Sequence, residues 1–100
     1  SLSDEIKILN DILYDIKEKR LISYLGDDEN ICIPNGVKLL GANSFFGKTM
    51  RQIKLPQSLE YIDETAFYWC FNLEQIIVPK GMKNISRLIP AYLQKLIREI

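Results

Sequence analysis

Residues 53–79, IKLPQSLEYIDETAFYWCFNLEQIIVP, begin and end with a short apolar segment that stops at a proline. The same pattern stands upstream at residues 31–34, ICIP, so three such prolines follow one another at intervals of 22 and 23 residues (Pro34, Pro56 and Pro79). Apolar side chains recur at the third and sixth positions after each proline, and phenylalanine stands at the eleventh position in the first two units (Val37, Leu59, Met82; Leu40, Ile62, Ile85; Phe45, Phe67). A fixed period of this length is typical of architectures in which each unit stacks on its neighbours.

The apolar segments predict one short strand per unit, and stacking places these strands side by side in a parallel sheet, with the phenylalanine turns on the other side. Side chains alternate along a strand, so every second one points inward and the others form an outer face. We expect the inward set to be Ile31, Ile33, Ile53, Leu55, Ile76 and Val78, and the outer set to be Asn30, Cys32, Gln52, Lys54, Gln75 and Ile77. The predicted fold class is an α/β solenoid of about 2.5 repeats, each of 22–23 residues, with helical caps at both ends.

The N-terminal segment predicts a cap for one end of the stack. Residues 3–20 carry apolar side chains at helical spacing, with Ser3 as N-cap, acidic residues in the first turn and basic residues in the last. We therefore expect an amphipathic helix there. Residues 21–25 then alternate in polarity, and a polar turn at residues 26–30 predicts that they fold back as a hairpin on residues 31–33.

The C-terminal segment predicts a second cap. The third unit has no phenylalanine turn after Ile85, and residues 90–100 instead carry an apolar stripe at helical spacing behind Pro90, which suits the first position of a helix. The chain thus divides into an N-terminal capping helix and hairpin (1–30), leucine-containing repeats (31–85) and a C-terminal capping helix (86–100), all within a single domain.

The second unit resembles the BspA-like leucine-rich repeats of bacterial surface antigens, whose pattern is I-x-I-P-x-x-V-x-x-I-G-x-x-A-F-x-x-C-x-x-L-x-x-I-x-I-P. The matching positions are Ile53, Leu55, Pro56, Leu59, Ile62, Ala66, Phe67, Cys70, Leu73, Ile76, Val78 and Pro79, with Asp63 where glycine is usual. The first unit keeps Gly41 and Phe45 but has Ser44 in place of alanine and no cysteine. The resemblance covers about residues 31–85. It implies a leucine-rich-repeat fold and, as in better-known members, adhesion or protein binding without catalysis; some members are cell-surface proteins.

The composition excludes several classes of function. The 13 basic and 13 acidic residues give no net charge, whereas nucleic-acid binders carry an excess of lysine and arginine. The absence of histidine removes the commonest general base and metal ligand. Cys32 and Cys70 are too far apart for a C-x-x-C motif, and we expect both to be reduced thiols. We therefore expect no enzyme activity, no cofactor and no metal.

The sequence also contains no apolar run near the ~18 residues that cross a bilayer and no signal-peptide pattern, so we expect no membrane insertion. Because upstream residues could have been removed, the sequence leaves the compartment open.

Residues 42–49, ANSFFGKT, formally satisfy a relaxed phosphate-loop pattern, in which glycine allows backbone N–H groups to surround phosphate and lysine meets its charge. A phosphate loop joins a strand to a long helix, whereas here Pro56 follows within seven residues of Thr49. Phe45 also belongs to the repeat core. We therefore favour a repeat turn, with nucleotide binding through Lys48 and Thr49 as the remote alternative.

Two sets of residues are candidates for binding a protein partner. Phe46, Tyr68, Trp69 and Phe71 lie on the turns, and stacking of the units is expected to bring Phe46 and Tyr68 together. If they are exposed, these aromatic side chains form an interaction patch; the alternative is that the caps cover them. Gln52, Lys54, Gln75 and Ile77 form a shallow array on the outer strand face. The sequence does not choose between the two.

Charge is distributed unevenly along the chain. Residues 1–30 hold four basic and eight acidic residues, a net −4, and residues 80–100 hold five basic and one acidic residue, a net +4. Opposite charge at the two ends would favour head-to-tail association into a homo-oligomer, whereas the ordinary interpretation is that each end has a solvated polar face. The sequence thus predicts a non-catalytic protein-binding or adhesion module, with a self-assembling structural segment as the alternative.

Overall fold

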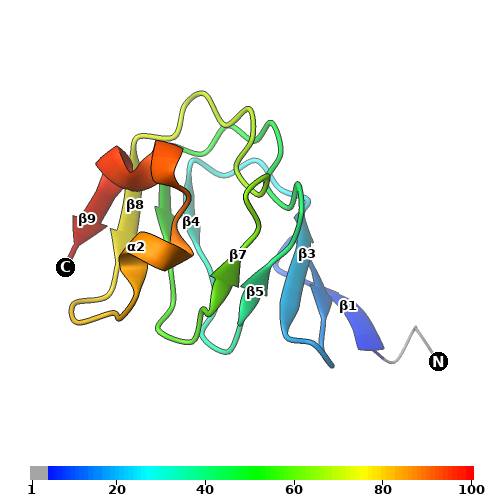
Figure 1. The fold of residues 1–100 in the computed structure, drawn as a ribbon. Helices are drawn as coiled ribbons and strands as arrows, with labels where there is room; N and C mark the ends of the chain where they lie inside the picture. The colour runs from blue at the N-terminus through cyan, green and yellow to red at the C-terminus, as the bar shows by residue number, and fades with distance from the viewer. Residues whose placement is uncertain (1–4) are drawn as a thin grey trace.

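A computed structural model describes residues 5–100, which form two β-sheets (Figure 1). The five-stranded sheet has the order β1-β2-β3-β5-β7, with bounds Ile6–Leu9, Ile12–Asp15, Arg20–Tyr24, Leu39–Leu40 and Tyr61–Ile62. The four-stranded sheet has the order β4-β6-β8-β9, with bounds Asn30–Cys32, Gln52–Lys54, Gln75–Val78 and Ile97–Glu99. Helix α2 (Ile85–Leu88) and the 3-10 helix η1 (Ala91–Leu96) lie between β8 and β9 in the chain.

The four-stranded sheet confirms the predicted stacking of the proline-terminated strands. Strand β4 pairs with β6 and β6 with β8, both parallel, and Ile31, Ile53 and Ile76 lie opposite one another. These isoleucines are buried, and the rings of Phe45 and Phe67 stack beside them with centroids 5.4 Å apart. Side chains one repeat apart therefore form continuous rows through the core.

A second parallel ladder runs through β3, β5 and β7, where Leu21, Leu40 and Ile62 occupy equivalent buried positions. The first two units therefore each supply one short strand to each sheet, whereas the sequence predicts a single strand per unit. The ring of Tyr24 stacks on Phe45 with centroids 5.5 Å apart, so the interior rows begin before residue 31.

The helix predicted for residues 3–20 is wrong, because residues 6–9, 12–15 and 20–24 form antiparallel strands; its predicted N-cap, Ser3, lies outside the described residues. Asn10 and Asp11 both have positive φ (49° and 64°), which is the geometry of a two-residue hairpin turn. Isoleucine and tyrosine favour strands, and pairing to the edge of the parallel ladder outweighs the helical spacing of the apolar residues.

The predicted hairpin between residues 21–25 and 31–33 is also wrong. Strand β3 pairs with β2 and β5, while β4 lies in the other sheet. The polar residues between them carry the chain from one sheet to the other, as the connections do in later units.

The C-terminal helix predicted over residues 90–100 is only partly present. Residues 91–96 form a 3-10 helix, and β9 follows it and pairs parallel with β8, with Ile97 opposite Ile76. The open hydrogen-bonding edge of β8 accounts for this change, because another strand satisfies it and a helix does not. Helical caps at both ends are therefore not what the structure shows. Within residues 5–100, no helix is long and apolar enough to cross a bilayer.

Candidate functional site

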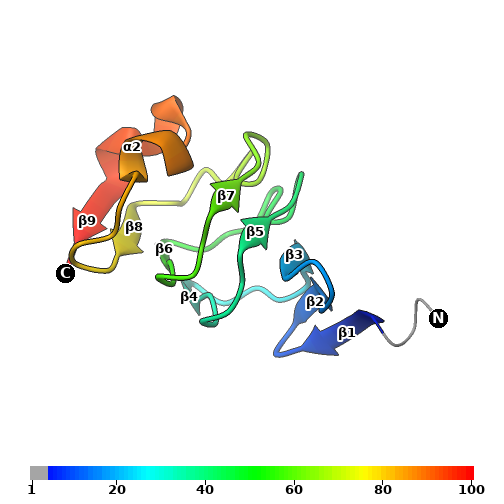
Figure 2. The same ribbon diagram turned by 60° about the horizontal axis from the view of Figure 1, so that its bottom comes forward.

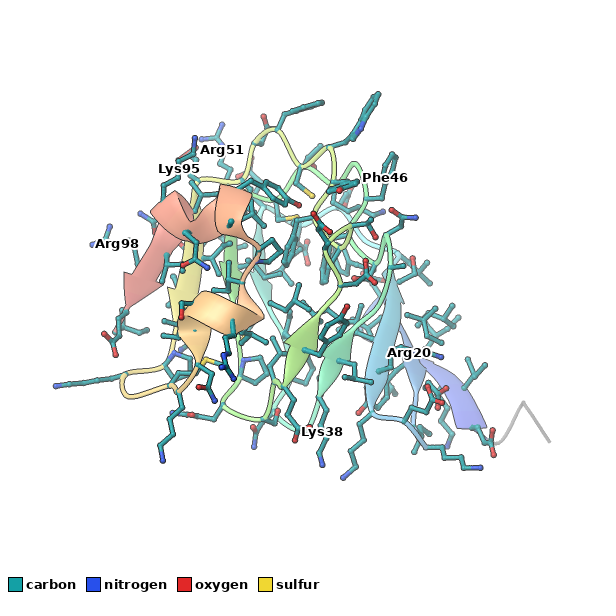
Figure 3. All side chains as sticks on the ribbon, viewed as in Figure 1. Arg20, Lys38, Phe46, Arg51, Lys95 and Arg98 are labelled. Carbon is teal, nitrogen blue, oxygen red and sulfur yellow. The ribbon has the colours of Figure 1, made fainter. Side chains whose placement is uncertain are left out.

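Three aromatic side chains on adjacent turns are strongly exposed and contact one another, and we call them the aromatic ridge: Phe46 (48% exposed), Trp69 (65%) and Phe71 (84%). The ring centroids of Phe46 and Trp69 are 5.8 Å apart, and those of Trp69 and Phe71 are 5.9 Å apart. Figure 3 shows Phe46 pointing outward on the side of the molecule opposite Lys38. The ridge is therefore one contiguous apolar surface.

The expected contact between Phe46 and Tyr68 is wrong. Tyr68 instead meets Tyr92 of the C-terminal segment, with ring centroids 6.0 Å apart, and the Tyr92 hydroxyl donates a hydrogen bond to the Glu64 carbonyl at 3.1 Å. Partial burial raises the pKa of Tyr92. Sequence reasoning missed Tyr92 because its segment was interpreted as a helix. The available signal was its register, since Tyr92 stands 13 residues after Pro79, as Trp69 stands 13 residues after Pro56.

Hydrogen bonds between the two turns position the ridge. The N–H of Phe45 donates to the Ala66 carbonyl at 2.8 Å, and the N–H of Gly47 donates to the Tyr68 carbonyl at 2.9 Å. The N–H of Asn43 donates to the Thr65 hydroxyl oxygen at 3.0 Å. That hydroxyl donates to the Asp63 carboxylate at 2.7 Å, which lowers the pKa of Asp63. The second turn is thus held in register with the first.

Trp69 has a left-handed backbone conformation, with φ of 64°. Gly47, at the same place one unit earlier, has φ of 67°. For a residue with a Cβ this region costs about 1–2 kcal/mol, whereas for glycine it does not. The repeat backbone therefore demands this conformation, and Trp69 adopts it at a cost in stability.

The thiol of Cys70 lies beneath the ridge and donates a hydrogen bond to the Phe45 carbonyl at 2.9 Å. Burial raises the pKa of the Cys70 thiol, and the backbone N–H groups of Lys48 and Gly47 offset part of that effect. Cys32 is exposed on β4, and both cysteines are free. Cys70 therefore acts in packing as a neutral, half-buried thiol.

The phosphate-loop pattern at residues 42–49 folds as a repeat turn. Five consecutive N–H groups, those of residues 44–48, donate to backbone carbonyls, so they are not available to a phosphate. The next element is β6 rather than a helix. The Lys48 ammonium lies 5.6 Å from the Tyr24 ring centroid, in a cation–π contact. The interpretation as a repeat turn is confirmed.

The repeated turns and ladders agree with a comparison against protein families. The family model described as BspA type Leucine rich repeat region (6 copies) matches residues 22–96, three quarters of the chain. The chain belongs to this family. The match begins inside β3 and ends at the last residue of η1. No curated protein and no solved structure matches the chain.

The second candidate surface of this BspA-type chain is the outer face of the four-stranded sheet. The register places Gln52 beside Gln75, and Lys54 beside Ile77. Strand β9 adds Arg98 next to Ile77. Just before these strands begin, Arg51 forms ion pairs with Glu29 and Glu74, each at 3.7 Å. The predicted array exists, and it is mainly polar.

Within residues 5–100 of the BspA-type chain, no group of three or more histidine, cysteine, aspartate or glutamate side chains is gathered closely enough to hold a metal ion. The arrangement offers surfaces for contact, and the leucine-rich repeat family to which it belongs generally mediates protein interaction.

Proposed function

We propose that this BspA-type leucine-rich repeat chain is a non-catalytic protein-binding module whose contact surface is the aromatic ridge. The observation that carries the proposal is the exposure of Phe46, Trp69 and Phe71 side by side. At about 200 Å² per aromatic residue, these exposed fractions leave roughly 400 Å² in contact with water, which is within the range of functional patches on monomers. Aromatic side chains buried at the centre of an interface supply much of its binding energy.

The conformation of Trp69 supports the same proposal. A backbone outlier persists where the surroundings enforce it, and such outliers concentrate at functional sites. Glycine fills the equivalent position at Gly47 without this cost. Trp69 is large, aromatic and mostly exposed at a position where glycine suffices for the fold. Its side chain therefore favours a role in binding over a role in folding.

The outer strand face is the weaker candidate for the contact. Its lysine side chain is of a type that interfaces contain less often, whereas tryptophan is enriched among the residues that dominate binding energy. Side chains alternate along each strand, with apolar ones in the core and mainly polar ones on the outer face. The polar character of the strand face therefore follows from the repeat and is not a sign of a binding site.

The test compares two triple variants of the full chain. The ridge variant carries Phe46→Ser, Trp69→Asn and Phe71→Ser, with asparagine chosen because it tolerates the left-handed conformation. The control carries Gln52→Ala, Lys54→Ala and Gln75→Ala on the strand face. Immobilised wild type is used to isolate binding proteins from cell extract, and affinities of the identified partner for each variant are then measured by calorimetry.

We expect the ridge variant to lose binding at least tenfold while the strand-face variant keeps it, with both unfolding near the wild-type temperature. Loss of binding in the strand-face variant alone would contradict the choice of surface. Equal binding by both variants would contradict the proposal as a whole.

Head-to-tail self-association is a second candidate, favoured by the position of the charges. Strands β1 and β9 lie at opposite ends of the molecule, whose longest extent is 41 Å (Figure 1, Figure 2). The N-terminal 30 residues carry a net −4 and residues 80–100 a net +4. Light scattering should show a mass that rises with concentration at low salt and falls when salt screens the charges. A mass that stays constant in both conditions would rule this candidate out.

A further inference from the structure

Strand β7 is the last strand of the five-stranded sheet, and among the residues that the structure describes it pairs with β5 alone. The repeat places Leu40 and Ile62 at the sixth position after a proline, and both lie in strands of this sheet. Ile85 stands at the same position of the third unit, but it begins α2 instead. Asn84 immediately before it has φ of 60°, which turns the chain out of the extended path. Within residues 5–100, no strand of the third unit therefore continues this ladder.

Two cavities occupy the space between β7 and the segment that contains α2. The larger has a volume of about 560 Å³ and the smaller about 280 Å³. Both are lined by Tyr61, Arg87 and Leu88, so they adjoin each other. On the β7 side their lining runs from Gln57 to Glu64. We call this space the β7 groove; the ribbons of the two elements that border it, α2 and β7, are labelled in Figure 2.

The backbone of β7 presents hydrogen-bonding groups to this groove. The N–H of Tyr61 donates to the Lys38 carbonyl at 3.1 Å, and the N–H of Asp63 donates to the Leu40 carbonyl at 2.9 Å. Alternate residues of a strand direct these groups to opposite edges, so the N–H and C=O of Ile62 face away from β5. Ile62 also lines the smaller cavity. The groove therefore follows an open strand edge.

The charges around the groove favour an acidic occupant. Lys83 and Arg87 line it from the α2 side, and neither belongs to an ion pair in the part of the chain that the structure describes. Glu60 and Glu64 line the β7 side, but Glu60 is paired with Lys38 at 3.7 Å. Residues 80–100, which supply the α2 wall, carry a net +4. With Glu60 and its partner Lys38 counted as neutral, Lys83 and Arg87 stand against Glu64, so the groove keeps a net charge of about +1, and its basic side chains lie on the α2 side.

We propose that the β7 groove binds an extended acidic peptide segment of a partner protein, which adds to the five-stranded sheet as a further strand beside β7. Backbone hydrogen bonds to Ile62 fix the strand, and its acidic side chains meet Lys83 and Arg87 on the α2 wall. Strand addition at an open sheet edge combines affinity from the main chain with selection through side chains. This site is separate from the aromatic ridge, and it stands or falls independently of it.

The test uses short synthetic peptides with blocked ends and a fluorescent label. The probe alternates glutamate with valine; one comparison peptide alternates lysine with valine, and another repeats the probe with N-methyl groups on its central amides. Binding to the full chain is measured by fluorescence anisotropy at physiological ionic strength. We expect both comparison peptides to bind about tenfold more weakly than the probe, because one has the wrong charge and the other cannot pair as a strand.

Matched variants locate the site. The double variant Lys83→Glu, Arg87→Glu should weaken binding of the probe about tenfold, whereas Lys54→Glu on the outer face of β6 should leave it unchanged. Hydrogen exchange followed by NMR provides a second readout: saturating probe should slow exchange of the Ile62 amide about tenfold or more. Circular dichroism confirms that each variant is folded.

Several outcomes would overturn the proposal. Equal binding of the N-methylated peptide, or equal weakening by Lys54→Glu, would reduce the effect to general electrostatic attraction. No binding of the probe, or an Ile62 amide whose exchange the probe does not change, would remove the site. Protection of the Ile62 amide that grows with concentration of the chain alone would assign the groove to a second copy of the chain instead.

Discussion

Two successive turns, residues 43–48 and 65–70, have equivalent backbones and share their interior but not their surface. Inside, Phe45 stacks on Phe67, with centroids 5.4 Å apart. Outside, Gly47 and Trp69 occupy the same left-handed position with φ of 67° and 64°. The fold needs this backbone conformation in both turns, and it needs the tryptophan in neither.

The difference separates what the repeat requires from what is added to it. Residues that repeat in identity or size, such as the paired phenylalanines, maintain the stacking of one unit on the next. Trp69 and Phe71 do not repeat in the first turn, and the structure leaves them exposed. The first turn adopts the same backbone without these two aromatic residues. The second turn therefore adds an exposed aromatic surface that the backbone itself does not require.

The largest expected effect breaks the shared interior. Phe45 is fully buried between Tyr24 and Phe67, and Phe45→Ala should destabilise the chain by about 3–5 kcal/mol, enough to unfold much of a domain of this size. Its exposed neighbour provides the control: Phe46→Ala should change stability by less than about 1 kcal/mol. Urea denaturation followed by circular dichroism measures both. Similar losses in the two variants would show that the ridge is part of the core.

The next effect exchanges the residues at the left-handed position. A Cβ at Gly47 meets no atom within 4 Å, so Gly47→Ala should cost about 1–2 kcal/mol from the backbone conformation alone. Trp69→Gly relieves that cost, but it loses ring contacts with Phe46 and Phe71 and gains chain entropy when unfolded, so its net effect should lie within about 1 kcal/mol of zero.

Denaturation midpoints of Gly47→Ala and Trp69→Gly measure the change in stability that each variant causes. The comparison between the turns fails if Trp69→Gly is the more destabilising change, because the tryptophan would then be structural.

A smaller effect concerns the buried position before each phenylalanine. Ser44 is 1% exposed, and its hydroxyl has no hydrogen-bond partner among residues 5–100, whereas Ala66 fills the same place in the second turn. A buried hydroxyl without a partner costs about 1–3 kcal/mol, so Ser44→Ala should stabilise the chain by about 1 kcal/mol. Ala66→Ser should destabilise it by a similar amount. A loss of stability in Ser44→Ala, measured by thermal unfolding, would indicate an ordered water on that hydroxyl.

The sequence predicted the middle of the molecule because the same residue types recur at a fixed interval. Ile31, Ile53 and Ile76 are paired as their spacing indicates, and the phenylalanines stack. The ends do not recur, so only local preference was available there. At residues 6–24 helical spacing competed with strand-forming side chains, and pairing with β5, invisible in the local pattern, decided the outcome.

The candidate site was predictable in composition and not in geometry. Repeat register identified the turn positions of Phe46, Tyr68, Trp69 and Phe71, but it paired Phe46 with Tyr68. In the structure, Trp69 has a left-handed backbone conformation and its ring stacks on Phe46, while Tyr92 meets Tyr68. The β7 groove had no signal in the pattern, because it arises where Ile85 departs from the strand that the repeat predicts.

The smallest effect is expected at the next position, where the first turn has Lys48 and the second has Cys70. Burial raises the pKa of the Cys70 thiol above its ordinary value, so the folded chain holds this proton more tightly than the unfolded chain. Its contribution to stability is therefore fully present below the unfolded pKa, about 8.5, and is lost as pH rises from there through the folded pKa.

Unfolding free energies measured at increasing pH should thus fall more steeply in wild type than in Cys70→Ala above this point. Cys32 is the internal reference, because it is exposed and should react with a thiol reagent faster than Cys70 at every pH in that window. A pH dependence that Cys70→Ala leaves unchanged would place the titrating group elsewhere. Equal reaction rates for the two thiols would show that the second turn opens readily, and the packing beneath Trp69 would then be looser than the stacking of Phe45 on Phe67 implies.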